Sequence, residues 1–148
     1  MGVPYDVFSM AFLDKVREYN FPMVDYERNG MVDGFMKKAI AQFKPVCLYD
    51  FSTTADDVVR AFDVEVEPED LDELADIVSE GMLVQWMKPY VYSGENLENV
   101  LNTKDFTEYS PANLLYRIKE AYNQAKRDYT NMIREYSYNH GDLTDLHI

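Results

Sequence analysis

The most regular pattern in this chain of 148 residues reads SPANLLYRIKEAYNQAKRDYTNMIREYSY and spans residues 110–138. Ser110 followed by Pro111 is typical of a helix start, because serine caps free N–H groups and proline at the first helical position lacks an N–H that would have no partner. Apolar or small side chains then recur at alternating steps of three and four residues: Leu115, Ile118, Tyr122, Ala125, Tyr129, Met132 and Tyr136. This spacing predicts one continuous face of a helix about 40 Å long.

The tyrosine-rich face of this helix allows two interpretations. The helix can pack along its own domain, or part of it can be covered by another chain, since tyrosine is unusual in the seam of a tight coiled coil. Tyrosine buries a rigid ring and keeps a polar tip, which suits protein interfaces. The second interpretation predicts an interface made of Tyr122, Lys126, Arg127, Tyr129, Arg134 and Tyr136.

Three further helices are expected before the long one, over residues 5–19, 25–43 and 68–88. Each carries an amphipathic stripe, and each is expected to end near a proline, because proline disfavours helical geometry in the residue before it. Pro89 is expected to stop the third helix. Residues 46–67 are less regular: we expect a short helix over 56–62 and an extended loop. The alternative is a two-stranded ribbon, with short strands over residues 47–49 and 62–66.

Together these elements predict an all-α fold, a helical bundle with a long C-terminal helix. A single helical domain is expected over residues 1–138, followed by an extended tail over residues 139–148. The tail is polar and contains a glycine, so its apolar side chains are expected to dock only in an assembly. Those docking residues are Leu143, Leu146 and Ile148. The predicted core consists of Phe12, Phe35, Ile40, Phe43, Leu74, Val78, Leu83, Trp86, Leu115 and Ile118.

Charge is unevenly distributed in a chain whose formal net charge is −13. Residues 50–80 contain twelve acids and one base, Arg60, whereas residues 111–136 contain five bases and three acids. This balance disfavours wrapping of DNA, because affinity for phosphates requires a basic surface. A solvated acidic face explains the pattern simply, and attraction between unlike faces of neighbouring copies is the alternative.

No catalytic, cofactor or metal site is expected. Both histidines, His140 and His147, fall at the predicted tail, so a Ser-His-Asp or Cys-His arrangement would depend on a chain end. Cys47 is a single cysteine in an apolar context, more typical of a core residue than of a nucleophile. The N-terminal stretch places acids within its apolar segment, so no signal peptide is expected, and no apolar run is long enough for a membrane span.

Three motifs carry a resemblance to a known class of proteins. They are Val84-Gln85-Trp86-Met87-Lys88-Pro89, then Ser93-Gly94-Glu95-Asn96-Leu97, then Lys104-Asp105-Phe106-Thr107-Glu108-Tyr109-Ser110-Pro111-Ala112-Asn113-Leu114-Leu115. The pattern resembles the head–tail connector proteins (adaptor, head-completion or neck proteins) of long-tailed bacteriophages of Gram-positive bacteria. In those proteins it precedes a long, charged C-terminal helix. The resemblance covers residues 68–138, and the first sixty residues contribute little to it.

The resemblance implies a structural virion protein, not an enzyme, located at the neck and made in the host cytoplasm. It implies a homo-oligomeric ring, commonly of twelve copies, that binds the portal protein and the next neck or tail-completion protein. DNA would pass through the ring without specific binding. A ring requires two different, complementary faces on each copy. The alternative is a small acidic regulatory or binding module, of the anti-repressor or DNA-mimic type.

Overall fold

The computed structural model describes residues 2–17, 29–92 and 111–140 of the chain. Its helices are α1 (Tyr5–Val16), α2 (Asn29–Phe43), α3 (Pro68–Tyr92) and α5 (Pro111–His140). Three two-residue strands, β1 (Val3–Pro4), β2 (Ala55–Asp56) and β3 (Ala61–Phe62), form a small antiparallel sheet in the order β1-β3-β2. Helix accounts for 73% of these residues, so the predicted all-α class is confirmed.

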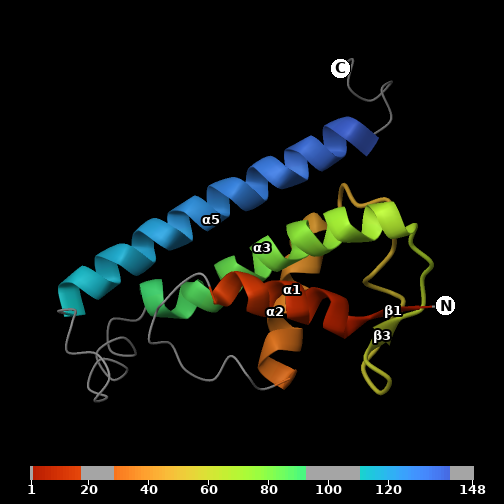
Figure 1. Cartoon of the computed structure of the whole chain (residues 1–148), viewed down its shortest axis with the longest axis horizontal. Helices are drawn as coiled ribbons and strands as arrows, with labels where there is room; N and C mark the ends of the chain where they lie inside the picture. Colours follow the sequence, from red (N-terminus) through yellow and green to blue (C-terminus); the bar gives the residue numbers. More distant parts are fainter. Residues whose placement is uncertain (1, 18–28, 93–110, 141–148) are drawn as a thin grey trace.

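Helix α3 is the central element, because α1, α2 and α5 all pack against it. Its first turn carries Glu69 and Asp70, where the helix dipole favours negative charge. From Gly81 to Met87 every residue is buried, so this half of the helix is surrounded on all sides. Figure 1 shows α5 running along one side of α3 and α1 lying on the other.

The core between α1, α2 and α3 is rich in aromatic rings. Phe12 of α1 meets the edges of Phe35 and Trp86, with ring centroids 5.9 and 6.1 Å apart. At the periphery, Lys15 Nζ of α1 lies 2.8 Å from Asp76 Oδ1 and 3.0 Å from Glu80 Oε1 of α3. Apolar burial thus holds the helices together, and the ion pairs add a small contribution at the edge of the contact between α1 and α3.

The predicted core residues are largely confirmed. Phe35 is half-buried and packs on the core, and the side chain of Leu115 lies outside the described part. The remaining eight are buried: Phe12, Ile40, Phe43, Leu74, Val78, Leu83, Trp86 and Ile118. Apolar periodicity was sufficient to identify them, since each points inward from a helix.

The predicted short helix over residues 56–62 is wrong. A ribbon is present, but its strands are β2 and β3 rather than the expected residues 47–49 and 62–66. Residues 55–62 form a hairpin in which Ala55 pairs with Phe62 and Asp56 with Ala61. Strand β1 extends the ribbon to three strands through Val3 and Phe62. The turn contains no glycine, and Arg60 instead adopts a left-handed backbone with φ of 53°. The hairpin lies on the side of the molecule away from α5 (Figure 1).

Two predicted helix ends are also corrected. Helix α3 continues through Pro89 to Tyr92, because Tyr90 and Val91 pack on the core and the Tyr92 ring contacts Tyr122. Helix α5 continues to His140, where the imidazole Nε2 lies 2.8 Å from Glu73 Oε1 of α3, so the predicted domain boundary after residue 138 falls inside a helix. Residues 18–19, 25–28 and 141–148 of the predicted elements lie outside the described residues.

Candidate interaction surface

Helix α5 has two faces with different environments. The inward face contains Ile118, Tyr122, Ala125, Tyr129 and Tyr136, all buried against the rest of the chain. These are the residues that the three- and four-residue steps of the sequence place together. The first interpretation of the tyrosine pattern, a helix packed along its own domain, therefore holds for this face.

Tyr129 occupies a notch between α3 and α2. A Cβ atom at Gly81 would lie 2.6 Å from Tyr129 Cζ and 2.8 Å from Ala39 Cβ, so glycine is what makes room for the ring. The Tyr129 hydroxyl donates to the carbonyl oxygen of Ala39 at 2.5 Å. Burial raises the pKa of this phenol, because the charged form would lose its hydration.

Tyr136 is buried like Tyr129, but nearer the C-terminal end of α5. Its ring meets Phe43 edge-on, with centroids 4.9 Å apart, and its oxygen accepts the backbone N–H of Leu48 at 3.2 Å. Burial raises the pKa of Tyr136 to about 12. Tyr122, near the other end, contacts the Tyr92 ring, and Lys126 Nζ lies 5.3 Å from the centre of the Tyr122 ring.

The prediction that Tyr122, Tyr129 and Tyr136 form a contact with another chain is therefore wrong. Their exposed fractions are 4%, 4% and 1% within one copy, so no surface remains for a partner to cover. The physical reason is the notch at Gly81 and Ala39, which gives a large ring a place between two helices. By contrast, the other predicted interface residues of this helix, Lys126, Arg127 and Arg134, are exposed.

The outward face of α5 carries a second periodic series, which we call the outer strip. It repeats at steps of four and three residues: Tyr116, Glu120, Asn123, Arg127, Asn131, Arg134 and Tyr138. All seven side chains are exposed, and the two terminal tyrosines are 63% and 71% exposed. At about 1.5 Å per residue, the strip extends roughly 33 Å.

Within the outer strip the polar contacts are local and weak. Tyr116 Oη donates to Glu120 Oε1 at 3.3 Å, and Arg127 Nη2 donates to Gln124 Oε1 at 3.0 Å. Among the described residues, neither Arg127 nor Arg134 forms an ion pair with a carboxylate of this chain. Tyrosine and arginine are the side chains most enriched in protein interfaces. The strip is therefore the candidate interaction surface of this helix.

Sequence reasoning missed Tyr116 and Tyr138, although a signal was present. The same helix that predicts the inward series also predicts the outward one, half a turn away. The two exposed tyrosines are the first and last residues of the outward series. Leu143, Leu146 and Ile148 of the predicted interface lie outside the described residues.

The acids of residues 50–80 do not form one continuous face. Asp57 and the Asp76–Glu80 pair contact lysines of α2 and α1, and Glu73 contacts His140. Asp50 accepts hydrogen bonds from the Thr53 and Ser52 side chains and backbone N–H groups, which hold its pKa at about 2. Much of the predicted acidic segment thus has structural partners within the chain.

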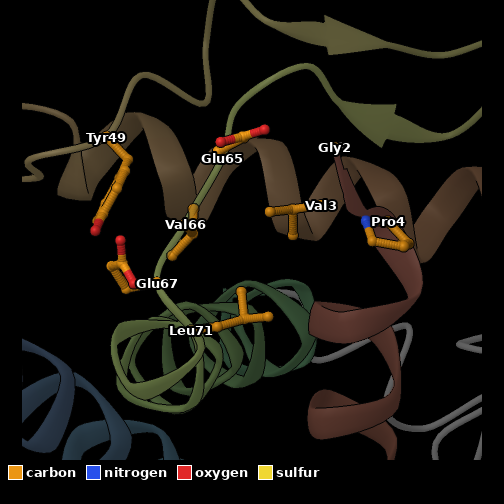
Figure 2. A pocket seen from close by; sticks show the side chains of 8 residues that line it. All are labelled: Gly2, Val3, Pro4, Tyr49, Glu65, Val66, Glu67 and Leu71. Atoms are coloured by element: carbon orange, nitrogen blue, oxygen red, sulfur yellow. The ribbon is translucent and has the colours of Figure 1, made fainter.

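A cavity of about 400 Å³ lies beside β1, as Figure 2 shows. Gly2, Val3 and Pro4 line one side, and Glu65, Val66 and Glu67 pass along the middle of the view. Leu71 lies below them, and Tyr49 lies on the side away from β1. The Tyr49 hydroxyl donates to Asp70 Oδ2 at 2.7 Å. A Cβ at Gly2 would lie 2.4 Å from the Phe62 carbonyl oxygen, so the backbones of β1 and β3 are in close contact at this point.

Within residues 2–17, 29–92 and 111–140, no cluster of three or more His, Cys, Asp or Glu side chains has the arrangement of a metal site. None of the helices in the same ranges has the length and apolar character needed to cross a bilayer. Cys47 is half-buried, and burial raises the pKa of its thiol. No family model, curated protein or solved structure matches this chain.

Proposed function

We propose that this chain is a head–tail connector protein of a long-tailed bacteriophage. In this proposal, copies of the chain form a ring beneath the portal protein and join the DNA-filled head to the next neck or tail-completion protein. A ring of twelve copies is the expectation that the resemblance supplies. The role is structural, and the proposal assigns no catalytic step to any residue.

The observation that carries the proposal is the outer strip of α5. A helix whose inner side is fully packed on α3 still presents two tyrosines and two arginines along its outer side. Tyrosine and arginine are enriched at protein interfaces, so this side of the helix suits a contact beyond its own domain. An exposed strip of this length, about 33 Å, suits a contact shared by large subunits rather than a small ligand.

The position of the resembling motifs supports the proposal in a second way. Trp86 of the first motif is 2% exposed and meets Phe12, so this part of the pattern describes the core that orients α3. The third motif ends in the first turns of α5, which lies along α3. The first and third motifs thus include residues of α3 and of the start of α5, the two helices whose packing positions the long helix.

Net charge is consistent with a protein that lets DNA pass. A formal charge of −13 opposes adhesion to the phosphate backbone, since the protein as a whole repels it. The rival, a small acidic regulatory module, would use the same charge to bind a basic site on a repressor or nuclease. The two functions differ in what the isolated protein associates with.

The proposal is tested by light scattering after size exclusion, with the chain alone and with the portal protein, followed by electron microscopy of the mixture. A closed ring of the chain on the portal is the expected result. Arg127→Glu combined with Arg134→Glu should weaken ring formation, whereas Lys44→Glu, at an exposed lysine after α2, is the matched control. A monomer that ignores the portal but binds a basic protein would favour the rival.

A further inference from the structure

The β2–β3 hairpin exposes two apolar side chains at its tip. Val58 is 93% exposed and Val59 is 67% exposed, although β-branched apolar residues are usually found inside proteins. The neighbouring residues along the chain are the acidic Asp56 and Asp57 on one side and Arg60 on the other. The tip therefore combines a small apolar knob with surrounding charge.

Arg60 holds this tip in one conformation. Its backbone is left-handed, with φ of 53°, an arrangement that side chains other than glycine, asparagine and aspartate rarely adopt. The guanidinium compensates with two parallel bonds to Asp33 of α2, Nε to Oδ2 at 3.0 Å and Nη2 to Oδ1 at 2.8 Å. Nη1 also contacts Asp6 Oδ1 of α1 at 3.0 Å. One side chain thus ties the hairpin to two helices.

Further bonds fix the residues that precede the valines. The Asp57 carboxylate accepts from Lys37 Nζ at 2.8 Å and from the Tyr5 hydroxyl at 2.7 Å. Asp56 Oδ1 accepts the backbone N–H of Val58 at 3.0 Å. The Arg60 carbonyl oxygen accepts the backbone N–H of Tyr5 at 2.9 Å. An apolar tip held this firmly loses little conformational entropy on binding, which is the property of a preorganised contact.

The tip and the outer strip of α5 are complementary and lie on opposite sides of the molecule (Figure 1). The hairpin offers exposed Asp56 and Asp57 next to its two valines, and exposed Asp63 at its base, where the Asp63 N–H donates to the Thr54 carbonyl oxygen. The strip offers Arg127 and Arg134 between two exposed tyrosines. Different faces on opposite sides of one chain generate head-to-tail contacts, and such contacts close into rings.

We propose that the hairpin tip of one copy docks on the outer strip of α5 of a second copy. This inference rests on the proposed function, because it identifies the two faces that meet when copies assemble. Val58 and Val59 contact the outer surface of the neighbouring helix, and the exposed carboxylate of Asp56 beside them faces its arginines. Charge sets the alignment, and the valine contacts slow dissociation.

The first test replaces both valines by serine. The Val58→Ser/Val59→Ser variant should unfold at the wild-type temperature, because neither side chain is buried, while its self-association on the portal weakens at least about tenfold. Met10→Ser is the matched control, since Met10 is an apolar residue of α1 that is 65% exposed. It should assemble as the wild type does.

The second test detects the contact directly. In a Cys47→Ala background, Val58→Cys protein is mixed under mild oxidation with protein carrying Cys at Asn123, Thr130 or Asn131. A disulfide requires the two Cβ atoms to lie within about 4.5 Å of each other. If the hairpin tip docks on the outer strip, at least one of the three positions should satisfy this distance and form a mixed disulfide with Val58→Cys. Met10→Cys mixed with the same partners should give no product.

The outcomes separate this inference from the proposed function. Normal rings from the serine variant, or rings without any Val58 cross-link to the three positions, overturn the hairpin contact and leave the connector proposal intact. Loss of portal binding with self-association unchanged overturns it as well, because the tip would then face the portal. Absence of assembly by the wild-type chain with the portal overturns both proposals.

Discussion

The inner and outer faces of α5 use the same residue type in opposite ways. Tyr129 and Tyr136 are inside the protein, whereas Tyr116 and Tyr138, on the same helix, are mostly exposed. The difference lies in what the rest of the chain places opposite each ring. On the inner side, Gly81 and Ala39 leave a notch and Phe43 offers an aromatic edge. On the outer side, the described residues place nothing over either ring.

Tyrosine alone therefore does not mark an interface. A tyrosine face at helical spacing becomes core when small residues on the facing helix make room for it. An exposed tyrosine on the other face of the same helix is then the better indicator of an interface.

The largest effect is expected from removing a buried ring. Tyr129→Ala should lower the free energy of unfolding by about 3–5 kcal/mol, because it leaves a cavity between α2, α3 and α5. Tyr138→Ala, at the exposed position, should change it by less than about 0.5 kcal/mol. Urea denaturation of both variants makes the measurement. Similar losses from the two substitutions would abolish the distinction between the faces.

The notch itself is tested by adding one methyl group. Gly81→Ala should cost about 1–2 kcal/mol, because the clash with the Tyr129 ring and Ala39 outweighs the helix propensity that alanine gains. Gly34→Ala in α2 is the matched control: nothing lies within 4 Å of its Cβ, so it should stabilise by up to about 1 kcal/mol. In the Tyr129→Ala background, the Gly81→Ala change should cost less. A stabilised Gly81→Ala protein would show that the notch has room for a methyl group.

Burial of the inner phenols predicts a dependence on alkaline pH. The folded pKa of Tyr136, about 12, exceeds the ordinary 10.0, so the unfolded chain loses its proton first. The stability that this buried phenol contributes is complete below pH 10 and is lost as pH rises toward 12. Tyr136→Phe should flatten the decline in guanidinium titrations between pH 9 and pH 12. Tyr138→Phe should leave it as steep as in the wild type.

The smallest effect is expected on the outer strip. Arg127→Ala combined with Arg134→Ala should change the melting temperature of the isolated chain very little, equivalent to less than about 0.5 kcal/mol, because neither guanidinium pairs with a carboxylate in the described structure. Calorimetry of the monomer checks this. A loss of several kcal/mol would mean that these arginines serve the fold.

The helices and most of the core could be predicted because apolar periodicity reflects burial directly. Phe12, Leu74 and Ile118 each fall on an apolar stripe, and each is fully buried. Proline was a weaker guide. Pro89 removes one hydrogen bond of α3, but packing of Tyr90 and Val91 on the core compensates, and the helix continues.

Features that depend on contacts between distant residues could not be predicted. The hairpin turn has no glycine to signal it, and its left-handed residue, Arg60, is held by Asp6 and Asp33 from other elements. The notch for Tyr129 depends on Ala39, ninety residues earlier in the chain. Such pairs leave no periodic trace, so the inner tyrosines could be assigned to core or interface only from the structure.

The notch also has a consequence for the order in which the protein folds. Tyr129 binds a site that exists only after α2 and α3 have come together, and it joins residues separated by ninety positions. During synthesis α1, α2 and α3 leave the ribosome before α5 has been made, so the apolar groove along α3 is initially open. Docking of α5 is then a late step with a long loop to close, which makes it slow compared with helix formation. The nascent chain therefore passes through a stage in which chaperones or other chains can reach this groove.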